Sequence, residues 1–134
     1  MQNLKDFLFF RRVLHAECHN MKYNKLRNIK TQIDGITFDS KLEAKRYCEL
    51  KLLVKACEIS DLKLQHPFPL VESCILNGRK KPGIKYLADF VYTKNGEKIV
   101  EDTKSSFIKK DPVYRIKKHL MKVVWDIDII EIMS

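Results

Sequence analysis

The chain has 134 residues, of which 45% are hydrophobic, and this size and composition are typical of one globular domain with its own core. Lysine and arginine outnumber aspartate and glutamate by 26 to 17, so the formal charge of +9 favours a polyanionic partner, either nucleic acid or an acidic membrane surface. No apolar run approaches the roughly 20 residues that span a bilayer, and we therefore expect a cytoplasmic protein without a membrane segment.

The first 20 residues differ in character from the rest of the chain. Six apolar residues between positions 7 and 14 can form one side of a short helix that docks onto a partner or mediates association. Residues 1–20 are therefore predicted to be a helical N-terminal extension, and a single domain is expected over residues 21–134.

Local signals mark the first elements of this domain. Asp34 and Gly35 predict a tight turn between two short extended pieces. Ser40 and Glu43 have the spacing of a capping box, in which serine caps the helix and glutamate reaches back to its start. Apolar residues recur at helical spacing after them, so we expect a helix over residues 40–57.

Extended segments follow this helix. Residues 62–65 alternate between apolar and polar, and Pro67 and Pro69 restrict the next segment to a sheet edge or a loop. We expect another strand over residues 70–76 and then a basic loop over residues 77–83.

Two further strands, over residues 84–92 and 99–103, are predicted to form a hairpin because Asn95-Gly96 between them is a strong turn signal. Both faces of the first of these strands are apolar, which is typical of a strand buried on both sides. Asp89 lies in the middle of it, where an isolated carboxylate would either take up a proton or need a cation.

Side-chain alternation predicts which residues of this hairpin share a face. Asp102 and Lys104 should point the same way along the second strand. On the first strand, Asp89 should share a face with its apolar neighbours at positions 87 and 91, whereas Tyr86, Ala88 and Phe90 should occupy the other face.

The last elements are a helix and a strand. Asp111 and Pro112 predict a helix start, with aspartate as the cap and proline at the first helical position. The final strand is expected over residues 126–132. The predicted apolar stripe of the helix consists of Val113, Ile116, Leu120 and Val123 or Val124.

Two carboxylates with a nearby ammonium group form a chemically coherent set. Mg²⁺ is commonly held by one or two carboxylates together with water and substrate phosphate, and Asp89 and Asp102 could supply them. A metal there would activate a water molecule, and Lys104 could orient that water or stabilise the charge of the transition state. The sequence therefore predicts a metal-dependent site for phosphodiester chemistry.

These residues resemble the PD-(D/E)XK nuclease superfamily, whose restriction-endonuclease-like core has the order αβββαβ, with a mixed central sheet flanked by helices. The resemblance implies Asp89, Asp102 and Lys104 as the catalytic set, with Glu43 from the first helix and the backbone carbonyl of Thr103 as additional metal ligands. Residues 36–44, 84–90 and 100–104 also resemble a family of small uncharacterised phage-encoded proteins placed in this superfamily.

This chain departs from the superfamily pattern in two places. Ala88 stands where the pattern has proline, and Asp102 stands where glutamate is common. Glu101 is adjacent to Asp102, so a shift in register would make Glu101 the second ligand, although alternation with Lys104 favours Asp102.

The resemblance implies an endonuclease that requires Mg²⁺ or Mn²⁺ and processes phage or mobile-element DNA in the bacterial cytoplasm. A branched substrate such as a Holliday junction, and a homodimer, are implied by the small basic members of the superfamily. The residues expected to contact DNA are the exposed cations Arg79, Lys80, Lys81, Lys85, Lys109, Arg115, Lys118 and Lys122.

Simpler interpretations stay open beside the catalytic one. Glu43 could serve only as a helix cap, and Asp89 could form a structural ion pair with Lys104. The whole chain could be a non-catalytic nucleic-acid-binding protein that keeps a nuclease fold, or a phage assembly adaptor that docks through residues 1–20.

Overall fold

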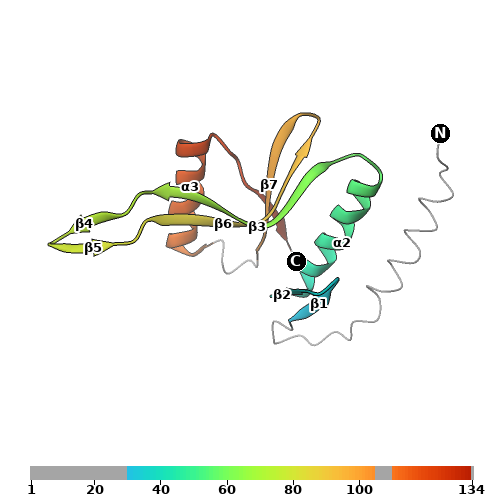
Figure 1. The fold of residues 1–134 in the computed structure, drawn as a ribbon, viewed down its shortest axis with the longest axis horizontal. Coiled ribbons are helices and arrows are strands. Elements are labelled where there is room, and N and C mark those ends of the chain that lie inside the picture. Colours follow the sequence, from blue (N-terminus) through green and yellow to red (C-terminus); the bar gives the residue numbers. More distant parts are fainter. Residues whose placement is uncertain (1–29, 105–109, 134) are drawn as a thin grey trace. The chain divides into compact units, whose positions relative to one another are not determined.

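The computed structural model describes residues 30–104 and 110–133, in two compact units divided after Ser60 (Figure 1). Each unit is described by itself. No helix of the described residues is long and apolar enough to cross a membrane. The elements are β1 (Thr31–Ile33), β2 (Ile36–Phe38), α2 (Lys41–Lys55), β3 (Ser60–Val71), β4 (Cys74–Leu76), β5 (Arg79–Lys81), β6 (Ile84–Lys94), β7 (Glu97–Lys104), α3 (Pro112–Trp125) and β8 (Ile130–Met133).

The fold is a mixed α+β fold, as the sequence predicts. Helix α2 is followed by β3, β6 and β7, and then by α3 and β8, which is the predicted order αβββαβ. Two short hairpins are added to this order. One, β1–β2, precedes α2, and the other, β4–β5, is inserted between β3 and β6.

In the first unit, β1 and β2 form the predicted tight turn and α2 has the predicted cap. Asp34 and Gly35 both adopt positive φ, at 53° and 76°, which a two-residue hairpin turn requires. The Oγ of Ser40 accepts a hydrogen bond from the N–H of Glu43 at 3.1 Å. Tyr47 and Lys51 of α2 both donate to the carboxylate of Asp34, so the helix and the hairpin turn are joined by side chains.

The second unit contains a four-stranded sheet with the order β3-β6-β7-β8. Strands β6 and β7 pair antiparallel, and β7 and β8 pair parallel, so the sheet is mixed. Strand β3 lies at the edge, which is where Pro67 and Pro69 can be accommodated. It is one strand of 12 residues rather than the two separate extended pieces that the sequence predicts.

The predicted strand over residues 70–76 is interrupted, and the predicted loop over residues 77–83 contains a strand. Leu70 and Val71 end β3, and the next residues form the separate β4–β5 hairpin. Its turn, Asn77-Gly78, has φ values of 52° and 74°. The same asparagine–glycine signal correctly predicts the β6–β7 turn. At Asn77-Gly78 the flanking strands have only three residues each, so they show too little alternation to indicate a hairpin.

Helix α3 packs on the sheet through a different face from the predicted one. Val113, Ile116 and Val123 are 59%, 61% and 69% exposed, so the predicted apolar stripe is wrong except at Leu120, which packs against the core. The residues that face the sheet recur every three or four positions, as one side of a helix must. They are Tyr114, Lys118, Met121 and Trp125, which bond or pack against β8, the core and β3.

The ends of α3 differ in how well the sequence predicts them. Asp111 caps the start as expected, because its Oδ1 accepts from the N–H of Val113 at 3.0 Å. Asp126, expected to begin the last strand, instead ends the helix with φ at 53°. The strand β8 therefore begins four residues later, at Ile130.

Candidate active site

Asp89 lies where the side-chain alternation of β6 breaks. Tyr86, Ala88 and Val91 belong to one buried cluster under α3, although strict alternation would separate Val91 from the other two. The period must therefore shift between Ala88 and Val91, which corrects the predicted assignment of faces. Pairing with β7 is seen from Lys94 as far as Phe90. Irregularities of this kind re-aim a side chain next to functional sites.

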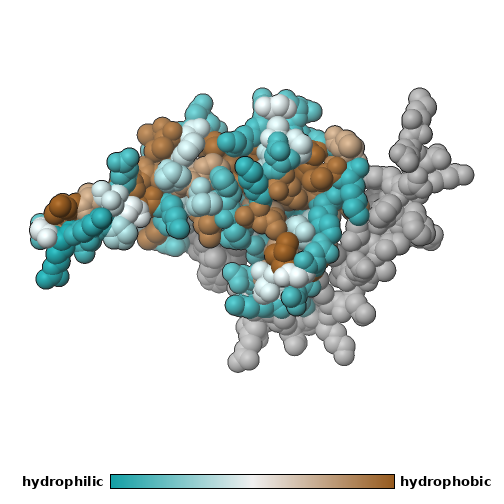
Figure 2. All heavy atoms as spheres, in the orientation of Figure 1, coloured by the Kyte–Doolittle hydropathy of each residue, from teal (hydrophilic) through white to brown (hydrophobic). Residues whose placement is uncertain are grey.

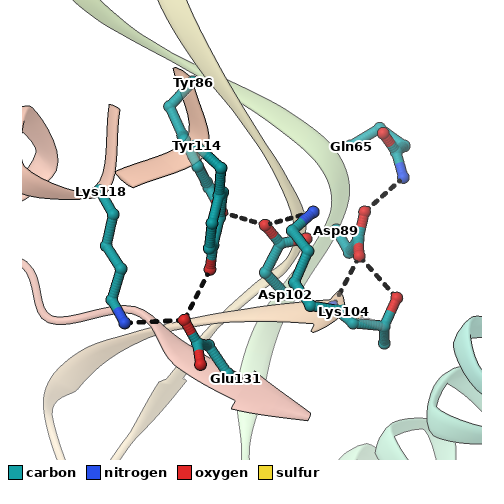
Figure 3. Close-up of polar contacts among 9 residues, drawn as sticks. Gln65, Tyr86, Asp89, Asp102, Lys104, Tyr114, Lys118 and Glu131 are labelled. Atoms are coloured by element: carbon teal, nitrogen blue, oxygen red, sulfur yellow. Dashed lines mark hydrogen bonds and ion pairs between the residues drawn. The ribbon is translucent and has the colours of Figure 1, made fainter. Parts of the chain in front are cut away.

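The carboxylate of Asp89 is held from both sides (Figure 3). Its Oδ2 accepts hydrogen bonds from the backbone N–H and from the hydroxyl of Thr103, each at 2.8 Å. Its Oδ1 accepts from the side-chain amide of Gln65 at 3.1 Å. Gln65 belongs to β3 and has a left-handed φ of 48°, an unusual backbone conformation for a residue of this size. These contacts fix the carboxylate between β3 and β7.

Asp102 is completely buried, with an exposed fraction of 0%. Its Oδ2 accepts a hydrogen bond from the hydroxyl of Tyr86 and lies 2.9 Å from the Nζ of Lys104. Its Oδ1 accepts no hydrogen bond, and among the described residues it is the single buried side-chain oxygen or nitrogen in this condition. A buried carboxylate oxygen without a partner costs free energy, and such a group in a folded protein is often completed by an ion or a ligand.

The two carboxyl groups perturb each other. Burial, and next the hydrogen bond and charge of Asp89, raise the pKa of Asp102 to about 7, against the lowering effect of Lys104 and Tyr86. Burial also acts to raise the pKa of Asp89, but hydrogen bonds from Asp102 and Thr103 outweigh it and keep that pKa below its usual range. The pair therefore takes up a proton at a higher pH than an isolated carboxyl group would.

Lys104 is held between Asp102 and an aromatic ring. Its Nζ lies 5.2 Å from the ring centre of Tyr114, and its side chain is only 18% exposed. The hydroxyl of Tyr114 donates in turn to Glu131 at 3.0 Å, and Lys118 lies 2.7 Å from the same carboxylate oxygen. Glu131 pairs with Asp102 in the register of β7 and β8. Figure 3 shows the hydrogen bonds and ion pairs around Asp89, Asp102 and Glu131 as three neighbouring groups, and the contact of Lys104 with the Tyr114 ring joins the group at Asp102 to the group at Glu131.

Glu101, the alternative second ligand, is positioned differently. It is 2% exposed, and its Oε1 accepts a hydrogen bond from the hydroxyl of Tyr92 at 2.6 Å. Alternation along β7 places it on the face opposite to Asp102. The geometry therefore brings Asp102, rather than Glu101, together with Asp89 and Lys104.

Glu43 belongs to the first unit. Its N–H donates to the cap residue, and its Oε2 accepts from the backbone N–H of Asp39 at 3.2 Å. The capping role is therefore confirmed, with Asp39 taking the position that the capping box gives to Ser40. A role for Glu43 as a metal ligand stays a prediction, because the two units are described separately.

The predicted DNA-contacting cations fall into three groups. Lys118 and Lys122 are ion-paired, Lys118 with Glu131, and Lys122 with Asp126 and Asp128 at 2.8 Å each. Lys109 lies outside the described residues. The remaining cations have exposed side chains, and they are Arg79, Lys80 and Lys81 on β5, Lys85 on β6 and Arg115 on α3.

The acidic pair fits a divalent cation. Asp89 and Asp102 supply hard oxygen donors side by side, and Asp102 retains a buried oxygen without a partner. No group of three or more histidine, cysteine, aspartate or glutamate side chains that could hold a metal occurs in the described part of the chain. A site with only two carboxylates is nevertheless typical of Mg²⁺, because this ion keeps several water molecules and is usually bound by one or two carboxylates.

Sequence reasoning missed four residues of this network: Gln65, Tyr86, Tyr114 and Glu131. Alternation places Tyr86 on the face away from the acids, because the break at Asp89 leaves no mark in the sequence. The approach of Gln65 depends on its left-handed backbone and on the pairing of β3 with β6. In the sequence, the one signal that Tyr114 faces the sheet is its position four residues before Lys118, on the same side of the helix.

Together, the mixed sheet, the buried Asp102 and the neighbouring Asp89 and Lys104 define an α+β protein with a polar site built across adjacent strands. Comparison with known protein families matches one family over most of the chain. The chain belongs to the family described as "Protein of unknown function (DUF1064)", whose model matches residues 21–129. Neither the curated proteins nor the solved structures contain a significant match to it.

Proposed function

We propose that this protein is a Mg²⁺- or Mn²⁺-dependent DNA endonuclease of the PD-(D/E)XK superfamily. The observation that carries the proposal is the completely buried Asp102, whose Oδ1 accepts no hydrogen bond and whose carboxyl group interacts with both Asp89 and Lys104. The order αβββαβ and the formal charge of +9 support it. Processing of phage or mobile-element DNA in a bacterial cytoplasm, and a homodimer, are further parts of this proposal that follow from the resemblance.

In the proposed reaction, Asp89 and Asp102 would hold the metal, and the backbone carbonyl of Thr103 would be a further ligand. The bound metal would supply an activated water molecule and polarise the scissile phosphate. Thr103 and Gln65 keep the Asp89 carboxylate in one orientation, so little reorganisation is needed when the substrate binds. In this proposal Lys104, whose Nζ lies 2.9 Å from Asp102, stabilises the negative charge that develops on the phosphate.

Protonation of Asp102 links this site to pH. With its pKa raised to about 7, the Asp102 carboxyl must release a proton before it can coordinate a cation. Metal affinity and cleavage should therefore both rise as the pH increases through 7. Tyr86 and Lys104, which favour the charged form, keep this transition from moving still higher.

The test is a cleavage assay on labelled duplex, single-stranded, flap and four-way-junction DNA with Mg²⁺, Mn²⁺ or EDTA. We expect metal-dependent cleavage by the wild type and its loss in Asp102→Asn and Lys104→Ala. Glu97→Gln is the matched control, because Glu97 is an exposed carboxylate at the start of the same strand. Cleavage that persists undiminished in Asp102→Asn would overturn the proposal.

A second candidate is a non-catalytic nucleic-acid-binding protein. The observation that favours it is that the protein's own groups already bond to three of the four carboxylate oxygens of the acidic pair. Gln65 and Thr103 donate hydrogen bonds to the two oxygens of Asp89. Tyr86 and Lys104 contact one oxygen of Asp102. A thermal-shift titration with Mn²⁺ separates the two candidates. The enzyme should be stabilised by Mn²⁺ and the Asp102→Asn variant should not, whereas a binding protein would show no metal effect in either form.

A further inference from the structure

The β4–β5 hairpin extends away from the sheet of its unit (Figure 1). Every residue from Val71 to Lys85 is exposed, including Ile75 at 76% and Leu76 at 55%. In Figure 2 the tip of this hairpin carries hydrophobic and hydrophilic residues side by side. Large apolar side chains at the end of a projecting hairpin are costly in water, so their position calls for a partner.

The strand register distributes these side chains in an unusual way. Ile75 is paired with Lys80, and Leu76 with Arg79. Residues that are directly opposite in an antiparallel pair lie on the same face. One face of the hairpin therefore carries Ile75 and Lys80, and the other carries Leu76 with Arg79 and Lys81, instead of one apolar face and one polar face.

This distribution of side chains excludes packing of one hairpin face on another protein surface. A hairpin that packs on protein buries one apolar face and leaves the polar face in water. Here both faces need an environment that is negatively charged and apolar at once. No acidic residue lies between Cys74 and Lys81, whereas three cations do. A nucleic-acid groove provides phosphates on both walls and base surfaces between them, and its major groove admits a two-stranded ribbon.

The two legs of the hairpin approach each other closely at its base, which restricts the direction in which the hairpin projects. A Cβ atom at Gly83 would lie 2.7 Å from the carbonyl oxygen of Val71, so only glycine permits the two legs to approach this closely. Beyond Gly83 the chain continues directly into β6, which carries Asp89. Asp89 lies eleven positions after Gly78, which is at most about 36 Å along extended chain, or about ten base pairs.

We propose that the β4–β5 hairpin is a DNA-binding arm of this protein, in addition to the acidic site. Arg79, Lys80 and Lys81 contact phosphates, and Ile75 and Leu76 pack against bases where the DNA is unstacked, as at a branch point. This inference deepens the proposed function, on which it rests for DNA as the partner. It assigns branched DNA as the substrate class and places the branch within about ten base pairs of the cleavage site.

The test measures binding without cleavage, by fluorescence anisotropy of labelled four-way junction and duplex DNA in EDTA. A variant with Arg79, Lys80 and Lys81 all changed to glutamine should lose at least tenfold in affinity for both DNAs. Its slope of log affinity against log salt should fall by about 2 to 3, because about three phosphate contacts are lost. The matched control is the Lys94→Gln/Lys98→Gln variant, which removes exposed cations from the β6–β7 hairpin of the four-stranded sheet.

The apolar residues are tested separately. Ile75→Ser/Leu76→Ser should reduce the preference for the junction over the duplex about fivefold or more while leaving the salt slope unchanged. All these side chains are exposed, so circular dichroism should show that the variants remain folded. Junctions whose arms are shorter than about ten base pairs should lose the same preference with the wild type.

The outcomes separate this inference from the proposed function. Affinities of both hairpin variants equal to the control would overturn the arm, even if the wild type cleaves DNA. Hairpin-dependent binding without any cleavage would support the arm and overturn the nuclease. Binding to phosphatidylserine vesicles that exceeds DNA binding and is lost in the same variants would overturn the DNA assignment in favour of a membrane surface.

Discussion

Thr103 donates two hydrogen bonds to one oxygen of Asp89, from its backbone N–H and from its hydroxyl, each at 2.8 Å. Together they fix the orientation of the carboxylate beside Asp102. The resemblance implies that the backbone carbonyl of Thr103 is a metal ligand, and that role stays a prediction. Its N–H and hydroxyl have the more direct structural role, because they set the orientation of the first carboxylate.

Thr103→Val should therefore weaken the site without dismantling it. The substitution keeps the shape and the backbone bond but removes the hydroxyl, which costs about 1 kcal/mol of unfolding free energy. Mn²⁺ affinity should fall severalfold because Asp89 becomes less well oriented. Urea denaturation and a Mn²⁺ titration measure the two effects, and Thr93→Val, on the neighbouring strand, is the control. Equal Mn²⁺ affinities for the two variants would contradict the orienting role.

The stability of the metal-free protein should decline as the pH rises from about 4 to about 7. The pKa of Asp102 is raised from 3.8 to about 7 in the folded protein, which therefore binds more protons in this window than the unfolded chain. Stability falls with rising pH under that condition and levels off above the folded pKa. Raising a carboxyl pKa by one corresponds to about 1.4 kcal/mol, so the total decline is on the order of 4 kcal/mol at most.

The Asp102→Asn variant should lack most of this decline, because asparagine does not titrate. Thermal melts of both proteins at pH 5 and pH 8, in EDTA and in Mn²⁺, measure the effect. Mn²⁺ should restore the wild type selectively at pH 8. An identical pH profile for both proteins would show that Asp102 titrates normally.

Tyr86→Phe removes the hydroxyl that donates to Asp102. The loss should cost about 1 to 3 kcal/mol at pH 8, where the buried carboxylate is charged, and less at pH 5, where it is protonated. Urea denaturation at both pH values measures the difference. Tyr47→Phe, whose hydroxyl serves the exposed Asp34, should show a smaller cost that changes little with pH. A pH-independent loss in Tyr86→Phe would instead indicate simple repacking.

Lys104→Ala should separate metal binding from cleavage. Its ammonium group lies 2.9 Å from Asp102 and competes with a divalent cation for the same carboxylate. At a pH well above 7, where Asp102 is charged in both proteins, Mn²⁺ should therefore bind at least as tightly as to the wild type, while the cleavage rate falls on the order of 10² to 10³-fold. Lys98→Ala, on the same strand but exposed, is the control. Retained cleavage together with weaker Mn²⁺ binding would assign Lys104 a structural role.

The corrected face of α3 makes a further prediction about stability. Met121 is 0% exposed, so Met121→Ala should cost about 2 to 5 kcal/mol of unfolding free energy. Ile116→Ser, in the stripe that the sequence favoured, should change the free energy by less than about 0.5 kcal/mol because Ile116 is 61% exposed. Denaturant titrations of the two variants measure the contrast, and a reversed order would restore the predicted stripe.

The sequence by itself determined the local boundaries of this fold and the identity of its acidic residues. The caps Ser40 and Asp111, the turns at Asp34-Gly35 and Asn95-Gly96, and the edge position of the proline-bearing strand all follow the predictions. These caps and turns depend on interactions within about four residues, so local chemistry is enough to specify them.

Only the tertiary structure decided which side chains meet. Helix α3 has two stripes that could face a sheet, and the choice of Tyr114 and Met121 depends on Glu131 and on the core beneath it. The break in alternation at Asp89 depends on contacts with Gln65 and Thr103, which are far away in the sequence. Such long-range contacts add no period or spacing to the sequence, so the pairing of Tyr86 with Asp102 became visible only in the folded chain.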